Sequence, residues 1–251
     1  MKLIILAAGQ GQRLRPLTDN KPKCMVEFRG KAIISYILEI SKSFPLNKLI
    51  IINGYKKEVL EDFISNKSVT FYTNKNFENT NMVNTLFCAK EEFNEDIIIS
   101  YSDIIYKKEV FEKIFNSTSD FSVIVDKKWE DLWNLRMENP LTDAETMKID
   151  ESNNILELGK KPKNINEIQG QYIGLIKISK NILPKIIDFY ENLDKNKIYD
   201  GKNFDNMYMT SFIQLIIDNL FKAKAELIEG GWLEIDSLQD LDNYTKANFI
   251  L

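Results

Sequence analysis

Short apolar runs alternate with amphipathic stretches along the first half of the chain, and this alternation limits the fold more than any other feature. The apolar runs have the length of strands and are rich in β-branched residues, as is typical of strands buried on both faces. They are Leu3–Leu6, Leu49–Ile52, Val69–Tyr72, Ile97–Ile99 and Phe121–Val125. Between them, apolar residues recur at three- and four-residue spacing, which predicts helices. These are Ala32–Phe44, Lys56–Ile64, Asn84–Phe93 and Lys107–Phe115. The pattern predicts an α/β fold with a mostly parallel central sheet, helices on both faces, and ligands at the carboxyl ends of the strands.

The second half of the chain contains more strand signals in succession. A hairpin is predicted from Met147–Ile149 and Ile155–Leu158, with Asn153 and Asn154 in its turn. The elements predicted after it are a strand Tyr172–Ile178, helices Ile182–Leu193 and Asn206–Leu220, a strand Ala225–Ile228 and a helix from Ser237. Because no Gly/Ser- or Pro-rich linker separates the halves, we predict a single domain over residues 1–251 with a small β-rich excursion from a mixed sheet.

The composition excludes several classes of protein. The absence of histidine rules out histidine-ligated zinc, a Ser-His-Asp triad and imidazole general bases. Two cysteines are too few for a disulfide framework or a cysteine-based metal cluster. The formal net charge of −4 argues against a nucleic-acid-binding protein, and no apolar run is long enough for a membrane span. The apolar start is too short for a signal peptide, so we expect a cytoplasmic protein that binds neither nucleic acid nor membrane. The oligomeric state stays open, a homo-oligomer included.

The loop after the first predicted strand carries the strongest functional signal. Its residues are Leu6, Ala7, Ala8, Gly9, Gln10 and Gly11. Small residues let the backbone approach a ligand closely, and glycines allow backbone N–H groups to surround an anion. Arg13 and Lys23 follow and add two cations, so the loop is suited to a triphosphate. The loop matches neither of two common phosphate-binding motifs. It lacks the Lys-Ser/Thr of a Walker loop, and it has Leu14 where a dinucleotide-binding fingerprint requires glycine.

Two acidic residues follow predicted strands that lie far apart in the sequence. Asp103 comes soon after the strand that ends at Ile99, and Asp236 lies in Gly231–Ser237 near the carboxyl end. Mg²⁺ is usually bound by one or two carboxylates together with substrate phosphates. The residues alone leave an alternative open for each, since Asp236 could cap the last helix with Ser237 and Asp103 could belong to a turn.

The motifs resemble those of the nucleotidyltransferases that make sugar nucleotides and related activated phosphates. That family has Ala-Ala-Gly-x-Gly-x-Arg-Leu, Pro-Leu-Thr and Pro-Lys, and this chain departs from it only in Cys24-Met25 after Lys23. The resemblance implies a Rossmann-like nucleotidyltransferase fold and in-line attack on the α-phosphorus of a nucleoside triphosphate. It also implies that residues 7–11 hold base and phosphates, that Arg13 neutralises the leaving pyrophosphate, and that Lys23 stabilises charge at the α-phosphate.

The resemblance extends to the acidic motifs and assigns the metal. Ser102-Asp103-Ile104 is similar to the family's Gly-Asp-hydrophobic motif, and Trp232 to Ser237 resembles its carboxyl-terminal Trp-x-Glu/Asp-Ile-Asp-Thr. Both motifs supply metal-binding aspartates in relatives. We therefore predict Mg²⁺ as the cofactor, with Asp103 and Asp236 as its ligands and Glu234 beside them. The domain then divides into a nucleotide-binding half, about 1–125, and an acceptor-binding half, about 126–251.

The choice of nucleotide depends on weaker motifs. Asn53 and Gly54 follow the second predicted strand, and Asn81 lies in Thr80–Leu86, where it or Asn84 could instead cap a helix. This last segment resembles Thr-Asn-Asn-x-x-Ser-Leu of the bacterial phosphocholine cytidylyltransferase branch, with Met82 and Thr85 as departures. The Gln-x-x-Pro-x-Gly typical of uracil- and thymine-recognising relatives is missing. We predict CTP as the nucleotide, with Asn53, Gly54, Asn81 and Ser102 added to its binding residues.

The acceptor site is predicted in the second half of the chain. The candidate acceptor-binding residues are Trp129, Arg136, Glu145, Lys160 and Tyr172, with Lys160 for the acceptor phosphate. A quaternary ammonium would need an aromatic cage with an acid, whereas an amino acid would need an arginine and an acid; the residues leave both open, and the aromatics could be core. The whole chain is similar to the cytidylyltransferase branch of capsule synthesis that uses phosphorylated glutamine. Phosphocholine, 2-aminoethylphosphonate and sugar 1-phosphates are alternative acceptors, and a catalytically silent nucleotide-binding regulator is the alternative from another class.

Overall fold

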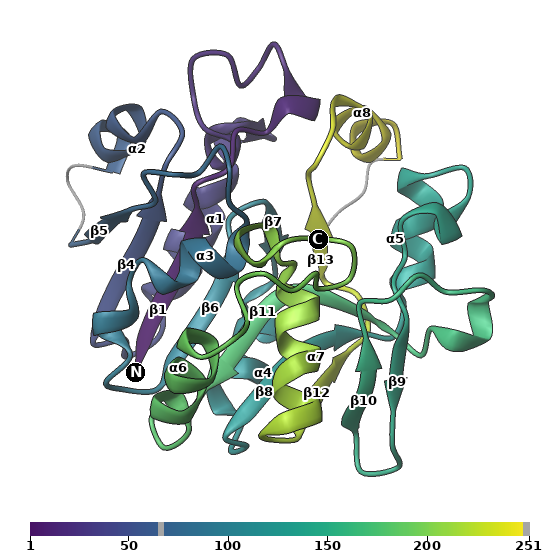
Figure 1. Cartoon of the computed structure of the whole chain (residues 1–251). Coiled ribbons are helices and arrows are strands. Elements are labelled where there is room, and N and C mark those ends of the chain that lie inside the picture. Colours follow the sequence, from purple (N-terminus) through teal and green to yellow (C-terminus); the bar gives the residue numbers. More distant parts are fainter. Residues whose placement is uncertain (65–67, 248–251) are drawn as a thin grey trace.

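A nine-stranded sheet forms the centre of the computed structural model, which describes residues 1–64 and 68–247 (Figure 1). The strand order is β5-β4-β1-β6-β11-β8-β12-β10-β9. The bounds are β1 Lys2–Ala7, β4 Lys48–Asn53, β5 Thr70–Thr73, β6 Ile97–Tyr101, β8 Phe121–Asp126, β9 Met147–Ile149, β10 Asn154–Leu158, β11 Gln171–Ile178 and β12 Ala223–Ile228. All of these strands except β10 and β11 run in one direction, which confirms the mostly parallel mixed sheet.

The apolar run of β1 is continuous because this strand is buried on both faces. It pairs in parallel with β4 on one side and β6 on the other, so that Leu3 lies opposite both Leu49 and Ile98. All six of its residues are buried. With no solvent-facing side of the sheet at this position, the sequence shows no alternation of polar and apolar residues.

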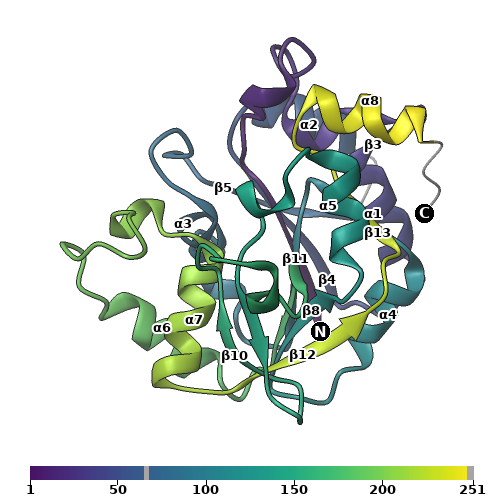
Figure 2. The same ribbon diagram turned by 90° about the vertical axis from the view of Figure 1, so that its right-hand side faces the viewer.

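Helices cover both faces of the sheet. Their bounds are α1 Ile33–Ser41, α2 Lys57–Ile64, α3 Met82–Phe87, α4 Lys108–Asn116, α5 Trp129–Arg136, α6 Leu183–Glu191, α7 Met209–Asn219 and α8 Leu238–Lys246. Figure 2 shows α3, α6 and α7 on one side and α1, α4, α5 and α8 on the other. Each face has its own apolar core: the first is centred on residues such as Leu86 and Phe212, the second on Phe111 and Trp129. In the described part of the chain, no helix has both the length and the apolar character needed to cross a membrane.

Two small antiparallel sheets lie apart from the central one. In the first, β7 (Ile104–Tyr106) pairs with β13 (Trp232–Glu234), and in the second β2 (Glu27–Phe28) pairs with β3 (Lys31–Ala32). None of these short strands was predicted from the sequence. The first sheet is the more important, because it joins segments from the two ends of the chain.

The structure differs from the sequence-based prediction at two helices. The predicted helix Asn84–Phe93 is instead α3, which begins after its cap Asn81 and ends at Phe87, followed by a 3₁₀ turn Lys90–Glu92. Helix α5 was not predicted. The predicted hairpin is β9–β10, and because β10 pairs with β12 it extends the main sheet.

Candidate active site

The loop after β1 is shaped by a glycine in the left-handed region. Gly11 has φ +62°, and its carbonyl oxygen accepts hydrogen bonds from the backbone N–H of Leu14 and the hydroxyl of Thr18, each at 2.9 Å. A Cβ atom on Gly11 would lie only 2.8 Å from the Cβ of Lys23. The glycine therefore permits both the turn and the close packing of Lys23 against it.

The pairing of β7 with β13 brings the two predicted metal ligands together. Asp103 precedes β7 and Asp236 follows β13, and because these strands are antiparallel, the two aspartates lie at the same end of the small sheet. The backbone N–H of Ile235 donates to the carbonyl oxygen of Asp103 at 2.9 Å. Asp236 thus follows a strand of the small sheet.

The N-terminal cap of α8 does not use the side chain of Asp236, which is therefore free to face the site. Ser237 is the N-cap, its hydroxyl accepting from the backbone N–H of Asp240, while the carboxylate of Asp240 accepts from the N–H groups of Asp236 and Ser237. This capping box fixes the backbone at Asp236 without using the Asp236 side chain. The alternative in which Asp236 caps the helix is therefore wrong.

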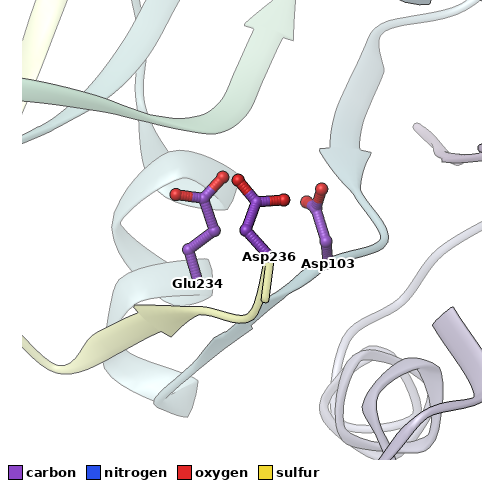
Figure 3. A group of neighbouring side chains, drawn as sticks. All are labelled: Asp103, Glu234 and Asp236. Atoms are coloured by element: carbon purple, nitrogen blue, oxygen red, sulfur yellow. The ribbon is translucent and has the colours of Figure 1, made fainter. Parts of the chain in front are cut away.

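Three carboxylates form the acid cluster, which we define as Asp103, Glu234 and Asp236. One oxygen from each lies within 4.8 Å of the others, and the three carboxyl groups project to the same side of the ribbon (Figure 3). One oxygen of Asp103, Oδ1, is buried without a hydrogen-bond partner. Hard oxygen ligands and an unsatisfied buried acceptor fit a divalent cation such as Mg²⁺.

Lys23 and Arg13 lie against the acid cluster. The Lys23 ammonium donates to Asp103 Oδ2 at 2.6 Å and to Asp236 Oδ1, and Arg13 Nη2 donates to Asp236 Oδ2 at 2.6 Å. Burial by itself would lower the pKa of Lys23, but the acid cluster raises it above its ordinary value. Burial would likewise raise the pKa of Asp236, but Lys23 and Arg13 hold it below the usual range. The structure thus brings together the two predicted catalytic cations and the two predicted metal ligands.

Arg136 lies behind the acid cluster and joins three elements. Its guanidinium, on α5, donates to Glu234, the last residue of β13, at 2.6 Å and to Asp240 on α8 at 3.1 Å. Its side chain is only 1% exposed. Burial and the charge of Asp236 raise the pKa of Glu234 to about 8, against the opposing effect of Arg136. These partners give Arg136 a structural position behind the acid cluster.

Two cavities flank the acid cluster. One, of about 120 Å³, is lined by the end of β1 and the loop after it, by Lys23, and by Ser102 and Asp103. The other, of about 190 Å³, is lined by Glu145, Tyr172 and Asp236 among others. Asn81 and Met82 line both cavities. Below, these are called the loop cavity and the second cavity.

The predicted nucleotide-binding residues divide into two groups. Those lining the loop cavity are Leu6, Ala8, Gly9, Asn81 and Ser102. Asn53 is fully buried, and its side-chain amide donates a hydrogen bond to Glu61 and accepts one from the hydroxyl of Thr73. Gly54 has no side chain, which lets its loop pack closely on Ala8. Neither Asn53 nor Gly54 lines the loop cavity, nor do Ala7, Gln10 and Gly11. Asn81 also caps α3 through its side chain, so it has a structural role as well.

The predicted acceptor-binding residues also divide. Glu145 and Tyr172 line the second cavity, but Trp129 is a core residue and Lys160 is an exposed side chain paired with Glu157 at 3.1 Å. Trp129, Arg136 and Lys160 therefore lie outside both cavities. The structure adds Asp143, Gln171 and Thr210 to the lining of the second cavity.

Gln171 shows why such residues escape sequence analysis. Its side chain accepts from the backbone N–H of Glu145 at 3.1 Å and donates to the Glu145 carbonyl oxygen at 2.5 Å, which fixes Glu145 at the cavity wall. No motif or spacing signals a contact of this kind, because it joins β11 to an irregular segment.

The chain belongs to the nucleotidyl transferase family, whose family model matches residues 2–173. It is therefore a nucleotidyltransferase, as its sequence motifs and this site indicate. Among its relatives, the chain is 46% identical to the CTP:phosphoglutamine cytidylyltransferase of Campylobacter jejuni, over 96% of this chain and 98% of that protein. It is also 36% identical to the choline-phosphate cytidylyltransferase of Streptococcus pneumoniae, over 49% of this chain and 53% of that protein.

Solved structures show the same fold. The CTP:phosphocholine cytidylyltransferase from Streptococcus pneumoniae superposes with a TM-score of 0.75 and 24% identity, covering 98% of each chain. The inositol-1-phosphate CTP transferase from T. maritima gives a TM-score of 0.76 with 18% identity, over 99% of this chain and 96% of that one. These likenesses confirm the nucleotidyltransferase fold.

Proposed function

We propose that this protein is a Mg²⁺-dependent cytidylyltransferase that transfers CMP from CTP to a small phosphorylated acceptor containing nitrogen. The observation that carries the proposal is the meeting of Asp103, Asp236, Lys23 and Arg13 between two cavities. Two cavities on either side of one charged cluster suit a reaction between two anionic substrates. The similarity over nearly the whole chain to a CTP-dependent relative supports CTP as the nucleotide.

The loop cavity is suited to the nucleotide. Ala8 and Gly9 have small side chains, so backbone groups can come close to a base or phosphate, and Lys23 supplies a cation at the same wall. Arg13, with 65% of its side chain exposed, lies where it can meet the outer phosphates. These positions support the proposed roles of Lys23 at the α-phosphate and Arg13 at the leaving pyrophosphate.

The proposed reaction needs charge neutralisation more than proton transfer. An oxygen of the acceptor phosphate forms a bond to the α-phosphorus, and the bond from that phosphorus to the bridging oxygen breaks, so pyrophosphate leaves with the electron pair. The attacking oxygen is already anionic, so no general base is required, which agrees with a chain lacking histidine. Asp103 and Asp236 would hold Mg²⁺, which when bound supplies positive charge to phosphate oxygens. Lys23 and Arg13 orient the phosphates and offset their mutual repulsion.

The second cavity supports an acceptor that carries a positive charge. Glu145 lies in its wall, and among the described residues its carboxylate forms no ion pair; its hydroxyl partner Thr210 is 3.5 Å away. No lysine or arginine of the described chain lines this cavity. A poorly paired, largely buried carboxylate is stabilised by a cationic ligand, so we assign the ammonium group of the acceptor to Glu145. The aromatic rings of Tyr101 and Tyr172 lie at the same cavity and suit a cation as well.

Phosphorylated glutamine is the acceptor we favour. It combines a phosphate with an amino-acid ammonium group, and it agrees with the similarity to the CTP:phosphoglutamine cytidylyltransferase. The product would be CDP-L-glutamine. Phosphocholine carries a cation too, and it is the acceptor to compare most closely.

The test is a matrix of nucleotides and acceptors. Pyrophosphate release is measured with CTP, UTP, ATP, GTP and dTTP against L-glutamine phosphate, phosphocholine, 2-aminoethylphosphonate and glucose 1-phosphate. We expect turnover only with CTP, fastest with L-glutamine phosphate. Turnover only with UTP or dTTP and a sugar 1-phosphate would contradict the proposal, and nucleotide binding without turnover in every combination would instead support a silent regulator.

Glu145→Gln tests the assignment within the second cavity. The variant keeps the size and hydrogen-bonding capacity of the side chain but removes its charge. We expect the KM for a cationic acceptor to rise about tenfold or more with the KM for CTP unchanged, since a buried ion pair is lost. Glu157→Gln, which removes a carboxylate on β10 outside both cavities, is the matched control. An unchanged acceptor KM in Glu145→Gln would show that the ammonium group binds elsewhere.

A further inference from the structure

The ammonium group of Lys23 occupies the position that a divalent ion would take. It contacts Asp103 Oδ2 at 2.6 Å and also Asp236 Oδ1, the two carboxylates that we propose as metal ligands. Arg13 binds the other oxygen of Asp236, Oδ2. The two cations together offset the negative charge of Asp103 and Asp236.

An ammonium and a divalent ion would repel each other strongly at this distance. The side chain of Lys23 is 13% exposed, and those of Asp103 and Asp236 are 12% and 16% exposed, so water screens this repulsion only in part. A divalent ion can therefore bind Asp103 and Asp236 only if the Lys23 ammonium moves away.

Lys23 has a place to move to without a change in the backbone. It lines the loop cavity together with Ala8, Gly9 and Ser102, so rotation of its side chain can carry the ammonium from the acid cluster into that cavity. Its backbone is held by Gly11, which packs on its Cβ, and by the 3₁₀ turn Lys23–Met25. The geometry thus allows two positions of the Lys23 ammonium, one against the acid cluster and one in the loop cavity, with the same backbone conformation.

We infer that Lys23 closes the metal site of the free protein and leaves it when a triphosphate enters the loop cavity. The inference rests on the proposed function, since it takes the triphosphate as the new partner of the ammonium group. Binding of nucleotide frees the carboxylates for the divalent ion, and the ion in turn favours the displaced lysine. Nucleotide and metal therefore strengthen each other's binding, and the free protein has a weak affinity for the metal alone.

The experiment measures binding of Mn²⁺ to the nucleotide-free protein by electron paramagnetic resonance, in wild type and in Lys23→Met. We expect Lys23→Met to bind Mn²⁺ about tenfold more tightly than wild type, because the competing cation is gone. In wild type, a CTP analogue with a non-cleavable α,β-methylene bridge should tighten Mn²⁺ binding by a larger factor than in Lys23→Met. Lys107→Met, which removes an exposed lysine beside β7, should match wild type.

The outcomes separate this inference from the proposed function. Equal or weaker Mn²⁺ binding in Lys23→Met than in wild type overturns the exchange of lysine for metal. Asp103→Asn should abolish the site in both backgrounds; unchanged Mn²⁺ binding in that variant would overturn the proposed metal ligands themselves. A thermal unfolding scan provides a second measurement. Loss of Lys23 removes the ion-pair partner of Asp103 and one of the partners of Asp236, so we expect Mn²⁺ to raise the Tm of Lys23→Met more than that of wild type. An equal rise in both proteins contradicts the inference.

Discussion

At the scale of single residues, Gly11 and Lys23 act as one unit. Gly11 adopts a left-handed backbone, and the missing side chain is the space in which the stem of Lys23 packs. Any Cβ at Gly11 would meet Lys23 at 2.8 Å and the Thr18 methyl group at 3.1 Å. The position of the ammonium beside the acid cluster thus depends on a glycine four residues after Ala7, the last residue of β1.

Gly11→Ala tests this coupling. Strain from the positive φ and the displaced Lys23 stem should lower kcat by about tenfold or more while destabilising the fold by only about 1 kcal/mol. Steady-state kinetics with CTP and the acceptor measures the first effect and urea unfolding the second. Gly30→Ala is the matched control, because Gly30 also has a positive φ but no atom within 4 Å of a Cβ placed there. Equal kcat values in the two variants would contradict the coupling.

Glu145 gives the site a dependence on pH. Burial and the nearby Asp143 raise the pKa of its carboxyl to about 7. Below that pH the group is neutral, and above it the carboxylate can hold an ammonium group. Asp143 and Asp200 are the other acids that act on it, while the hydroxyl of Thr210 opposes them.

We therefore expect the acceptor KM to fall as the pH rises from about 6 to about 8. Glu145→Gln should remove most of this change, which separates it from titration of the acceptor phosphate. A pH profile of KM for both proteins is the measurement. The same slope in both would show that Glu145 does not titrate in this range or does not bind the acceptor.

At the scale of elements, the antiparallel pairing of β7 with β13 assembles the acid cluster. Each strand has three residues, and Glu234 lies opposite Ile104 across the pair. Such short strands separated by so many residues leave no periodic signal, so sequence analysis could find Asp103 and Asp236 only through motifs. It could not show that the aspartates share one small sheet, nor that Arg136 lies behind them.

Arg136 is expected to stabilise this arrangement. It joins α5 to β13 and α8 through Glu234 and Asp240, and it is buried. Arg136→Met should lower the free energy of unfolding by about 3 kcal/mol, because two buried carboxylates lose their cation. Urea unfolding measures the change. Unchanged stability with a raised acceptor KM would contradict the structural role and restore the acceptor-binding role predicted from the sequence.

At the scale of the whole molecule, charge is concentrated at both ends of the central sheet. The site lies at the carboxyl end of β1, whereas a second network lies at its amino end, around Lys2. The Lys2 ammonium donates to Glu92 at 2.7 Å and to Asn94 at 2.6 Å, and Tyr72 donates to Glu92 at 2.8 Å. Burial alone would raise the pKa of Glu92, but hydrogen bonds from Lys2, Lys48 and Tyr72 lower it to about 2.

This second network should contribute to stability and not to catalysis. Glu92→Gln is expected to cost about 3 kcal/mol at neutral pH with kcat unchanged, because it breaks a buried pair far from the acid cluster. Folding lowers the pKa of Glu92, so the ionised side chain stabilises the folded protein fully at a pH above its pKa in the unfolded chain. This stabilisation is lost as the pH falls toward the pKa of Glu92 in the folded protein. The difference between the two proteins should therefore narrow between about pH 5 and about pH 3 in urea unfolding. A difference that stays constant over this range would contradict the assignment.

The sequence predicted the centre of the molecule better than its edges. Buried parallel strands such as β1 and β4 are continuous apolar runs whose signal is local, and their predicted bounds agree with the structure to within one or two residues. The structure of the second half of the chain depends on contacts between residues far apart in the sequence. Trp129 belongs to the apolar core, and β10 extends the central sheet by pairing with β12. Aromatic and basic residues near a predicted site look alike in sequence whether they line a cavity or lie outside it, which is why the sequence could not show that Trp129 and Lys160 lie outside both cavities.

The most direct test of the account is a crystal structure with the non-cleavable α,β-methylene analogue of CTP and Mg²⁺. We predict the analogue in the loop cavity against Ala8 and Gly9, the ion on Asp103 and Asp236, and the ammonium of Lys23 turned from these carboxylates toward the phosphates. An analogue bound away from this loop, or an ion held by other residues while Lys23 stays on both aspartates, would contradict it.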